Sequence, residues 1–377
     1  MSRMIAVLAV AAALSAPHAA AAQHSVDPGA YAAGEETYAA IRPMIADMHR
    51  IVTPDGVETT ETVMLGGIPQ WISIRGVDRD NPILIYVHGG PGASEMGRSV
   101  SWRRGVEEFF TVVHWDQRGT GKTLRANGLE AIRPTLDRER MASDLVELID
   151  LLRARFGQRK VVLLGHSWGN VIGLDAALRR PDAVSAYVSL SPALAMQENE
   201  RVAYARLLEM ARERGDVQGL AALEALAPYP GEALDPQRLG IQRGYVMRYG
   251  GLAAYRDNGE FFMKAARLSP DYDLEDRQAI DAGGEASIQA LLPALMETDL
   301  RSVRRTPFPV VLMVGRHDLT TPPEVSEAWL EALDAPSKTL VRFEHSAHLA
   351  PHEEPGRFLL ALVQHVLPLA TAGAGTP

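Results

Sequence analysis

The chain has 377 residues, a formal net charge of −9 at pH 7 and no cysteine. The absence of cysteine excludes disulfides, thiolate nucleophiles and cysteine metal sites. An acidic chain is also a poor match for a polyanionic partner, which argues against nucleic-acid binding.

Residues 1–22 have the pattern of a signal peptide. Arg3 supplies the positive start, and the apolar run 4–14 is too short to cross a bilayer as a helix. Small residues at 20–22 match the cleavage rule and place the mature start near Gln23. We therefore expect an exported protein, periplasmic or secreted in a bacterium, without stable membrane insertion after cleavage. An alanine-rich tail on a cytosolic protein is the alternative.

Short apolar runs alternate with amphipathic stretches along most of the chain. A helical lead at 31–48 precedes two strand-like runs, 58–65 and 69–76. Residues 138–157 and 322–334 carry helical periodicity. Six further runs are continuously apolar, as in a parallel sheet covered on both faces: 82–90, 110–117, 160–167, 186–193, 309–318 and 339–346. This alternation predicts an α/β fold with a doubly wound, mostly parallel sheet.

The interval 193–300 breaks this rhythm because it contains no convincing buried strand. It is rich in Ala, Leu, Glu and Arg, with Gly and Pro breaks at APYPGEALDP (227–236) and DAGGEAS (281–287). We expect a helical cap inserted between two strands of the sheet. The division expected is a first core segment at 23–192, the cap at 193–300, a second core segment at 301–368 and a flexible tail at 369–377.

The pentapeptide GHSWG (165–169) stands between an apolar run and a helical stretch. A strand, G-x-S-x-G and a helix in this order are typical of a nucleophile elbow. The glycines let the strand and the helix approach, and the sharp turn exposes Ser167 Oγ as a nucleophile. The backbone N–H of Trp168 can then face an oxyanion at the helix N-terminus, and its indole is a candidate wall of the substrate pocket.

A serine nucleophile needs a base, and the base needs an orienting acid. Asp318 directly follows a late apolar run, and His348 lies in the loop after the last one. Because parallel strands end at the same edge of a sheet, both residues can meet Ser167 there. His345 remains an alternative base. Asp334 is an alternative acid, although it ends a helical stretch and does not follow a strand.

The loop HGGPG (88–92) follows an earlier apolar run. Only glycine lets the backbone come close to a reacting carbonyl, so we expect the N–H of Gly90 as the second oxyanion donor. A plain Gly/Pro turn is the alternative.

The segment WDQRGTGKT (115–123) ends like a phosphate-binding loop. Asp116 occupies the position where such a loop needs its first glycine, so nucleotide binding is rejected. The sequence also has no H-E-x-x-H pair or other compact ligand cluster. We therefore expect neither a cofactor nor a metal.

Five segments together resemble the proline iminopeptidase (prolyl aminopeptidase) branch of the α/β-hydrolase superfamily, peptidase family S33. They are HGGPG, WDQRGTGKT, GHSWGN, GRHD and SAHLAPHEEP, and the resemblance runs from about residue 67 to 367, omitting most of the insertion. It implies a triad of Ser167, Asp318 and His348, an oxyanion hole formed by Gly90 and Trp168, and a helical cap over the site.

Two features depart from that family. Its peptidases recognise a free N-terminal amine through acidic residues of the cap, often near a tryptophan-rich stretch, and 193–300 has no such stretch. Glu200, Glu209 and Glu260 are the candidate amine anchors. His166 stands where these peptidases often have glycine.

The sequence thus predicts an exported serine hydrolase that acts through an acyl-enzyme on a short-peptide or small-molecule substrate. The resemblance favours a proline iminopeptidase-like aminopeptidase that removes N-terminal proline or small residues. The alternative is a carboxylesterase or lactonase acting on a small ester such as a xenobiotic or an antibiotic, because the same machinery cleaves both bonds. A non-catalytic binding protein that uses the same pocket is a third hypothesis.

Overall fold

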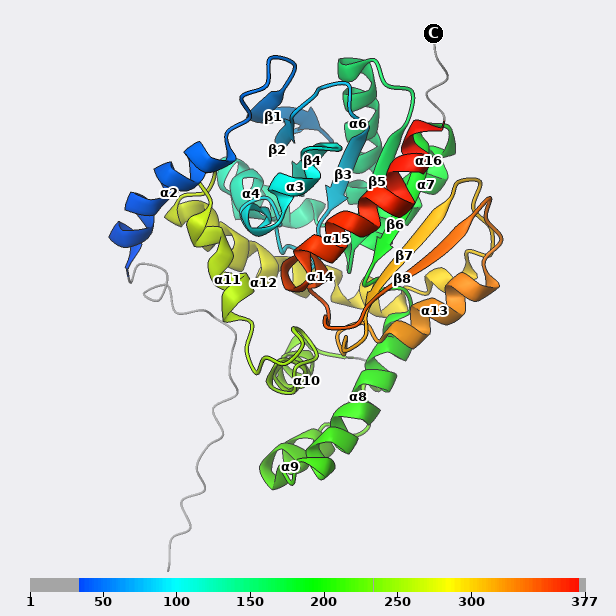
Figure 1. The fold of residues 1–377 in the computed structure, drawn as a ribbon. Helices are drawn as coiled ribbons and strands as arrows, with labels where there is room; N and C mark the ends of the chain where they lie inside the picture. The colour runs from blue at the N-terminus through cyan, green and yellow to red at the C-terminus, as the bar shows by residue number, and fades with distance from the viewer. Residues whose placement is uncertain (1–33, 233, 373–377) are drawn as a thin grey trace, which may run out of the picture.

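The computed structural model describes residues 34–232 and 234–372 (Figure 1). The signal peptide expected at 1–22 lies outside the described residues. The centre of the fold is one eight-stranded sheet in the order β1-β2-β4-β3-β5-β6-β7-β8. Its strands are β1 (Val57–Leu65), β2 (Ile68–Gly76), β3 (Ile83–Val87), β4 (Thr111–Trp115), β5 (Val161–His166), β6 (Val184–Leu190), β7 (Val310–Gly315) and β8 (Lys338–Phe343).

Most neighbouring strands of the sheet run parallel. β1 and β2 form an antiparallel hairpin, and β2 pairs antiparallel with β4. β3 lies parallel between β4 and β5, and β5 to β8 continue in parallel order. The doubly wound, mostly parallel sheet expected from the sequence is confirmed. The parallel strands β3 to β8 present their carboxyl ends along one edge, which is where open α/β sheets place their ligand sites.

The helices outside the interval between β6 and β7 flank this sheet, except α2, which lies beside residues 266–268. They are α2 (Glu35–His49), α3 (Arg103–Val106), α4 (Gly121–Asn127), α5 (Leu129–Ile132), α6 (Arg138–Phe156), α7 (Gly169–Arg179), α13 (Pro323–Ala332), α14 (Ala350–Glu353), α15 (Pro355–Ala361) and α16 (Leu367–Thr371). A π-helical turn, Leu362–Val366, joins α15 to α16. Residues 369–371 are therefore helical, although the sequence placed them in a flexible tail.

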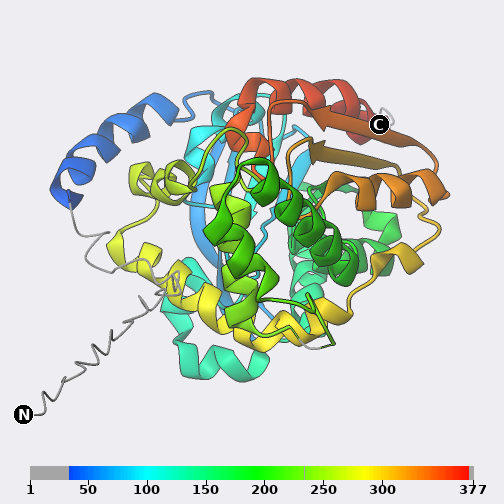
Figure 2. The same cartoon turned by 90° about the horizontal axis from the view of Figure 1, so that it is seen from below.

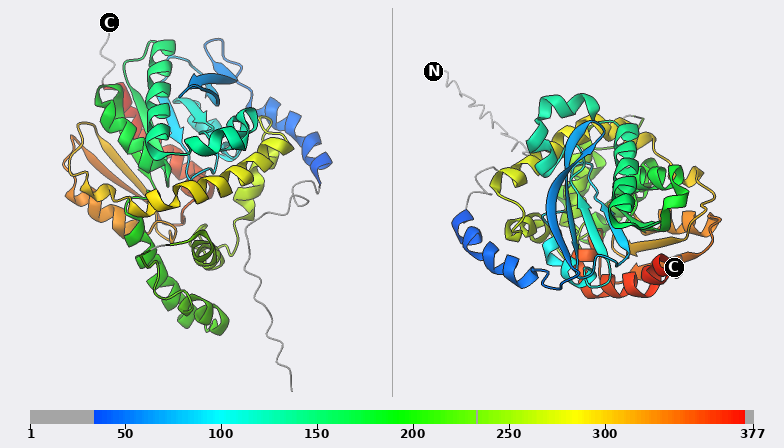
Figure 3. Two further views of the ribbon diagram at one scale, coloured as in Figure 1. Left: turned by 180° about the vertical axis from the view of Figure 1, so that it is seen from behind. Right: turned by 90° about the horizontal axis from the view of Figure 1, so that it is seen from above.

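Both faces of the sheet are covered, which is why its central strands are apolar throughout. Along β3, Ile83, Ile85 and Val87 belong to one hydrophobic cluster, whereas Leu84 and Tyr86 belong to another. Residues of α6 and α7 complete the first cluster, and residues of α3 and α15 complete the second. Figure 3 (right) shows this layering from above.

Five α-helices and no strand separate β6 from β7 among the described residues: α8 (Met196–Glu213), α9 (Val217–Glu224), α10 (Pro236–Arg248), α11 (Glu260–Ala265) and α12 (Leu274–Glu297). We call them the insertion; seen from below they lie across the end of the sheet (Figure 2). An isolated antiparallel bridge between Ala195 and Asp299 joins the two ends of the insertion. Beside it, Leu300 N donates to Leu194 O at 2.7 Å. No helix in the described ranges is long and apolar enough to span a membrane.

The glycine pair of DAGGEAS does not break a helix, so that expectation was wrong. α12 runs through the pair without interruption and crosses the core (Figure 3, left). A Cβ at Gly283 would lie 2.0 Å from the carbonyl oxygen of Gly119, and one at Gly92 would lie 2.8 Å from Gly284 Cα. The glycines let α12 touch two loops of the core, and this tertiary contact outweighs their low helix propensity.

Candidate active site

Ser167 occupies the turn between β5 and α7, at the carboxyl edge of the sheet. Its φ of 54° lies in the left-handed region, which costs a non-glycine residue about 1–2 kcal/mol. A Cβ at Gly169 would lie 2.0 Å from the carbonyl oxygen of Val87, and one at Gly165 would lie 2.9 Å from that of Gly169. Both flanking positions are therefore restricted to glycine because the backbone of a neighbouring segment passes within contact distance.

Asn170, in the first turn of α7, holds this strained turn from inside the core. Its Nδ2 donates to the carbonyl oxygen of Gly165 at 2.8 Å and lies 3.2 Å from those of Ser167 and Leu190. Its Oδ1 accepts a hydrogen bond from Ser189 Oγ at 2.8 Å. The role of Asn170 was not predicted from the sequence. The last letter of GHSWGN was the available signal, because a buried amide at a helix start must form hydrogen bonds to nearby groups.

Asp318 and His348 lie in contact at the same edge. His348 Nδ1 is 2.8 Å from Asp318 Oδ2, and both side chains are buried. Asp318 Oδ1 accepts from the backbone N–H groups of Thr320 and Thr321, at 2.7 and 2.9 Å. Thr321 Oγ1 lies 3.0 Å from Asp318 Oδ2. These partners fix the carboxylate, which in turn fixes the imidazole ring.

The contact with Asp318 determines the tautomer of His348. Since a carboxylate only accepts, Nδ1 carries the hydrogen and Nε2 presents its lone pair. Among the described residues, Nε2 has no hydrogen-bond partner, and no hydrogen bond joins it to Ser167 Oγ in this conformation. Catalytic hydrogen bonds are often long in an unliganded enzyme and tighten when substrate binds.

Glu353, at the end of α14, holds the loop that carries His348. Its carboxylate accepts from the backbone N–H groups on either side of that residue, Ala347 at 3.0 Å and Leu349 at 3.0 Å. It also accepts from Ala254 N in the insertion at 2.6 Å. Burial raises the pKa of Glu353 to about 7, against these backbone donors. The insertion and the His348 loop thus share one carboxylate.

His166, the elbow residue that departs from the family pattern, also contacts this loop. Its Nε2 lies 3.0 Å from the carbonyl oxygen of His348, and the two ring centroids are 4.9 Å apart. Burial lowers the pKa of His166 to about 3, so the ring is neutral and Nε2 is the donor. A histidine at this position therefore ties the elbow to the His348 loop.

The two alternative residues lie elsewhere. His345 is exposed, and its Nδ1 lies 3.3 Å from Tyr255 Oη. The Asp334 side chain is 74% exposed and forms an ion pair with Arg305 at 3.3 Å. The structure therefore brings Asp318 and His348 together and leaves His345 and Asp334 at the surface.

The HGGPG loop passes directly beside the elbow. A Cβ at Gly89 would lie 2.9 Å from Ser167 Cβ, and Gly90 has a φ of 113°, where only glycine is relaxed. Among the described residues, the backbone N–H groups of Gly90 and Trp168 have no hydrogen-bond acceptor. Two unpartnered N–H groups beside a serine are the arrangement that an oxyanion hole needs.

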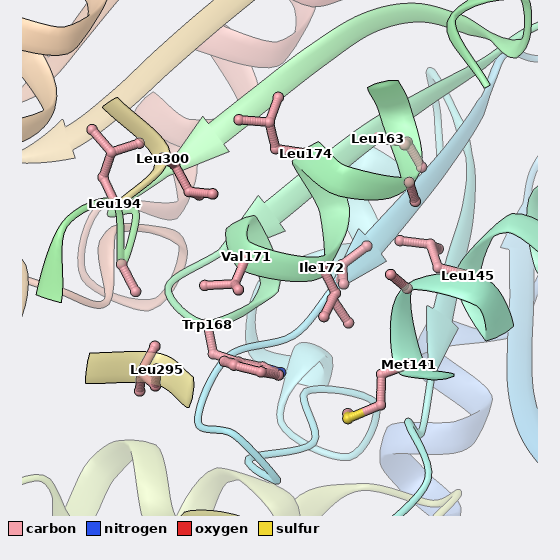
Figure 4. Packing of buried hydrophobic residues seen from close by; sticks show 14 of the residues in the cluster. Met141, Leu145, Leu163, Trp168, Val171, Ile172, Leu174, Leu194, Leu295 and Leu300 are labelled. Atoms are coloured by element: carbon pink, nitrogen blue, oxygen red, sulfur yellow. The ribbon is translucent and has the colours of Figure 1, made fainter. Parts of the chain in front are cut away.

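Gln117 connects the two loops that carry these N–H groups. The fully buried side chain donates from Nε2 to His88 O at 3.0 Å and accepts from Trp168 Nε1 at 3.3 Å. The sequence suggested the indole of Trp168 as a wall of the substrate pocket, and this prediction was wrong because Trp168 does not line the cavity. It packs in the core, in the hydrophobic cluster that also contains Val171 and Leu295 (Figure 4). Gln117 was not predicted from the sequence, since no local pattern marks it beyond its place in WDQRGTGKT.

Ser167 and Gly90 line a cavity of about 1170 Å³ between the sheet edge and the insertion. Much of its remaining wall comes from α10 and α12. Its apolar side chains include Met196, Leu239, Ile241, Phe262, Met263, Ile280, Ile288 and Leu295. Its charged side chains are Arg98, Arg243, Asp281 and Glu285. The volume exceeds what a drug-sized ligand needs.

Residues 82–355 match the family model of the alpha/beta hydrolase fold. The chain belongs to the α/β-hydrolase family. The hydrolase is 29% identical to the probable aminopeptidase YbaC of Bacillus subtilis over 302 residues, which cover 80% of this chain and 94% of the relative. The family match and this relative confirm the resemblance to the proline iminopeptidase branch.

Solved structures share the fold of the hydrolase. A proline iminopeptidase from Mycobacterium smegmatis has a TM-score of 0.62 at 17% identity, and the match covers 83% of this chain and 99% of that chain. The esterase EaEST from Exiguobacterium antarcticum has a TM-score of 0.55 at 21% identity, with 82% and 99% covered. At these identities the two structures establish the common fold alone.

The glutamates suggested as amine anchors do not line the cavity of the hydrolase. Glu200 is fully buried and forms an ion pair with Arg243, while Glu209 and Glu260 are exposed. Glu260 pairs with Lys264 at 2.6 Å. Helical periodicity alone could not tell which acidic side chains face the cavity, because these glutamates and the acids of α12 all occupy polar positions on helices.

WDQRGTGKT joins the core of the hydrolase to its insertion. Asp116 accepts hydrogen bonds from Tyr272 Oη and from Lys122 N, the latter at 2.7 Å. Lys122 Nζ pairs with Asp276 of α12 at 2.6 Å. Burial raises the pKa of Asp116 to about 6.

No group of acids, histidines or cysteines that could hold a metal occurs among the residues that the structure describes.

Proposed function

We propose that the hydrolase cleaves an acyl bond with Ser167 as nucleophile, His348 as base and Asp318 as orienting acid. The 2.8 Å contact between His348 Nδ1 and Asp318 Oδ2, at the same sheet edge as a serine with a φ of 54°, carries this proposal. The contact holds Nδ1–H in place and leaves Nε2 to accept a proton.

The reaction then follows from the geometry. Nε2 of His348 takes the proton of Ser167 Oγ as Oγ bonds to the carbonyl carbon, and the carbonyl electron pair moves to its oxygen. The N–H groups of Gly90 and Trp168 stabilise that oxyanion, each by about 3 kcal/mol. His348 returns its proton to the amine or alcohol as the bond between the carbonyl carbon and this leaving group breaks. Water then attacks the acyl carbon while His348 takes its proton, and His348 gives that proton to Ser167 Oγ as the acyl–Oγ bond breaks.

We propose a proline iminopeptidase-like aminopeptidase as the activity, acting on N-terminal proline or small residues. The similarity to the B. subtilis aminopeptidase over 94% of its length supports this choice. Two acids of α12, Asp281 and Glu285, line the cavity that holds Ser167. Their negative charge is what binding of a free N-terminal ammonium requires. We therefore propose these two acids as the amine anchors, in place of the glutamates suggested from the sequence.

Hydrolysis of a small carboxylic ester or lactone is the second candidate. The apolar side chains on the cavity wall favour it, because they suit an uncharged acyl or alcohol group.

The test compares prolyl and alanyl nitroanilides with short-chain nitrophenyl esters. We expect turnover of the nitroanilides, and Ser167→Ala should lower kcat by roughly 10⁵-fold or more. Ser185→Ala is the matched control, because this buried serine bonds Val161 O at 3.1 Å at the opposite end of the sheet. A fluorophosphonate should label the wild type and Ser185→Ala but not Ser167→Ala.

The same experiment tests whether Glu285 recognises the amine of the substrate. Glu285→Gln should raise KM for the nitroanilides and leave the esters unchanged, with the exposed Glu209→Gln as control. Ester cleavage without nitroanilide cleavage would eliminate the aminopeptidase and retain the ester hydrolase. Turnover that persists in Ser167→Ala would refute the nucleophile.

A further inference from the structure

Arg98 is a buried cation on the wall of the cavity that holds Ser167. It follows the HGGPG loop, is 3% exposed and lines the same space as Ser167 and Gly90. Burying a guanidinium is costly unless its charge is paired and its donors are bonded.

The hydrogen-bonding capacity of Arg98 is largely unused. Nη1 donates to Ser94 O at 2.6 Å, and the guanidinium carbon lies 4.6 Å from the ring centre of Phe262. Nε is buried without a partner, and in the described part of the chain no carboxylate lies within 4.0 Å of the guanidinium. An arginine has five N–H donors, so most of them remain available.

Neighbouring charges do not supply the missing counterion. Glu95 already accepts from Trp102 Nε1 at 2.9 Å and pairs with His352 Nε2 at 2.8 Å. Although burial opposes ionisation, these partners and the charge of Arg98 hold the pKa of Glu95 at about 2. Its charge therefore reaches Arg98 only at longer range.

Arg243, the other arginine of the cavity, provides a comparison. It forms an ion pair with the fully buried Glu200 and also bonds Gln242. Its charge is thus neutralised within the protein, whereas that of Arg98 is not. Among the described residues that line this cavity, Arg98 is the cation that is left for a ligand.

We propose that Arg98 binds a carboxylate of the substrate, so that the hydrolase acts on short, anionic acyl compounds. Resting on the proposed function, this makes the peptide substrates short enough for a carboxylate to share the cavity with the scissile bond. That carboxylate is either the free C-terminus or an acidic side chain. The α12 acids and Arg98 then recognise opposite charges of one short, zwitterionic molecule.

The first test uses esters and needs only hydrolase activity. The nitrophenyl half-ester of glutaric acid carries a carboxylate, whereas nitrophenyl valerate is its neutral counterpart. We expect kcat/KM to favour the half-ester at least tenfold in the wild type, since a charge-assisted pair supports a difference of about that size. Arg98→Gln should abolish the preference through KM and leave valerate within about twofold. Arg98→Lys should retain part of the preference.

The matched control is Arg256→Gln, which removes the same charge from an exposed arginine that lines a different cavity. It should keep the preference. No preference in the wild type, or an equal loss on both esters in Arg98→Gln, would overturn the proposal and leave Arg98 a structural role. If Arg98→Gln does not fold, Arg98→Lys decides the same question.

The second test separates the two carboxylate sources. It compares the peptides Pro-Ala, Pro-Ala-amide and Pro-Asp-amide by turnover and by calorimetric binding to the Ser167→Ala protein. A preference for Pro-Ala identifies the C-terminus, and a preference for Pro-Asp-amide identifies a side chain. Equal binding of all three, unchanged by Arg98→Gln, would contradict carboxylate recognition. Retained ester preference without peptide cleavage would refute the aminopeptidase alone.

Discussion

Gln117 joins the two loops that carry the proposed oxyanion donors, so Gln117→Met should lower both stability and kcat. Methionine has a similar length and volume, so the core around the site keeps its packing. The change removes both hydrogen bonds of the side chain and leaves His88 O and Trp168 Nε1 without their partner. Each buried group left unsatisfied costs about 1–3 kcal/mol.

The magnitude follows from these contacts. Because the indole bond is long at 3.3 Å, we place the total loss of unfolding free energy in the lower half of the range, about 2–4 kcal/mol. The effect on catalysis arises from the N–H groups of Gly90 and Trp168. If the two loops drift apart, part of the roughly 3 kcal/mol supplied by each donor is lost, so kcat should fall about 10- to 100-fold.

Gln70→Met is the matched control. Gln70 is equally buried, accepts from Trp115 Nε1 at 2.9 Å and donates to Leu65 O at 3.1 Å and to Asp144 Oδ2 at 2.9 Å. It does not contact the HGGPG loop or the elbow. Urea unfolding should show a loss of stability in Gln70→Met at least as large as that in Gln117→Met, because Gln70 also bonds the buried Asp144. The kcat for a nitrophenyl ester should nevertheless fall only in Gln117→Met. An unchanged kcat in Gln117→Met, or an equal fall in Gln70→Met, would refute the reasoning.

Two further predictions concern stability. Gly169→Ala should destabilise the protein by about 3 kcal/mol or more, because its Cβ would lie 2.0 Å from Val87 O, whereas Gly240→Ala, which meets nothing within 4 Å, should be neutral or stabilising. Thermal melting checks this pair, and equal melting temperatures would show that the elbow can relax. Burial raises the pKa of Glu353 from 4.5 to about 7, so its contribution to stability is complete below pH 4.5 and is lost as the pH rises through 7. Urea titrations should therefore show the wild type losing stability relative to Glu353→Gln across that window; a flat or rising difference would mean that the backbone donors keep the carboxylate ionised.

The parts of the site that the sequence could predict are those set by local order along the chain. Ser167, Asp318 and His348 each lie in the turn or loop that follows a strand, and parallel strands end at one edge of a sheet. The contact between Asp318 and His348 therefore needed no knowledge of distant packing. The same reasoning separated Asp334, which does not follow a strand, from the candidates at the edge.

What escaped prediction depends on partners that are remote in the sequence. Glu200 looks like any helical glutamate until its buried pairing with Arg243 is known. Gln117 acts through two loops whose spacing no periodicity reveals. The glycines of DAGGEAS were interpreted by their propensity, but the close approach of Gly119 decides their role. In each case a contact across the fold overrides the local pattern.

The bridge between Ala195 and Asp299 has a consequence for how this enzyme can change. The chain leaves and rejoins the core at adjacent points, so the arrangement of the sheet does not depend on the length of the insertion. With the ends already held together, a longer or shorter segment alters the closure entropy only slightly. The insertion can thus vary in length, and exchanging it between homologues should transfer substrate preference where the contacts of α12 with Gly92 and of Ala254 with Glu353 are kept.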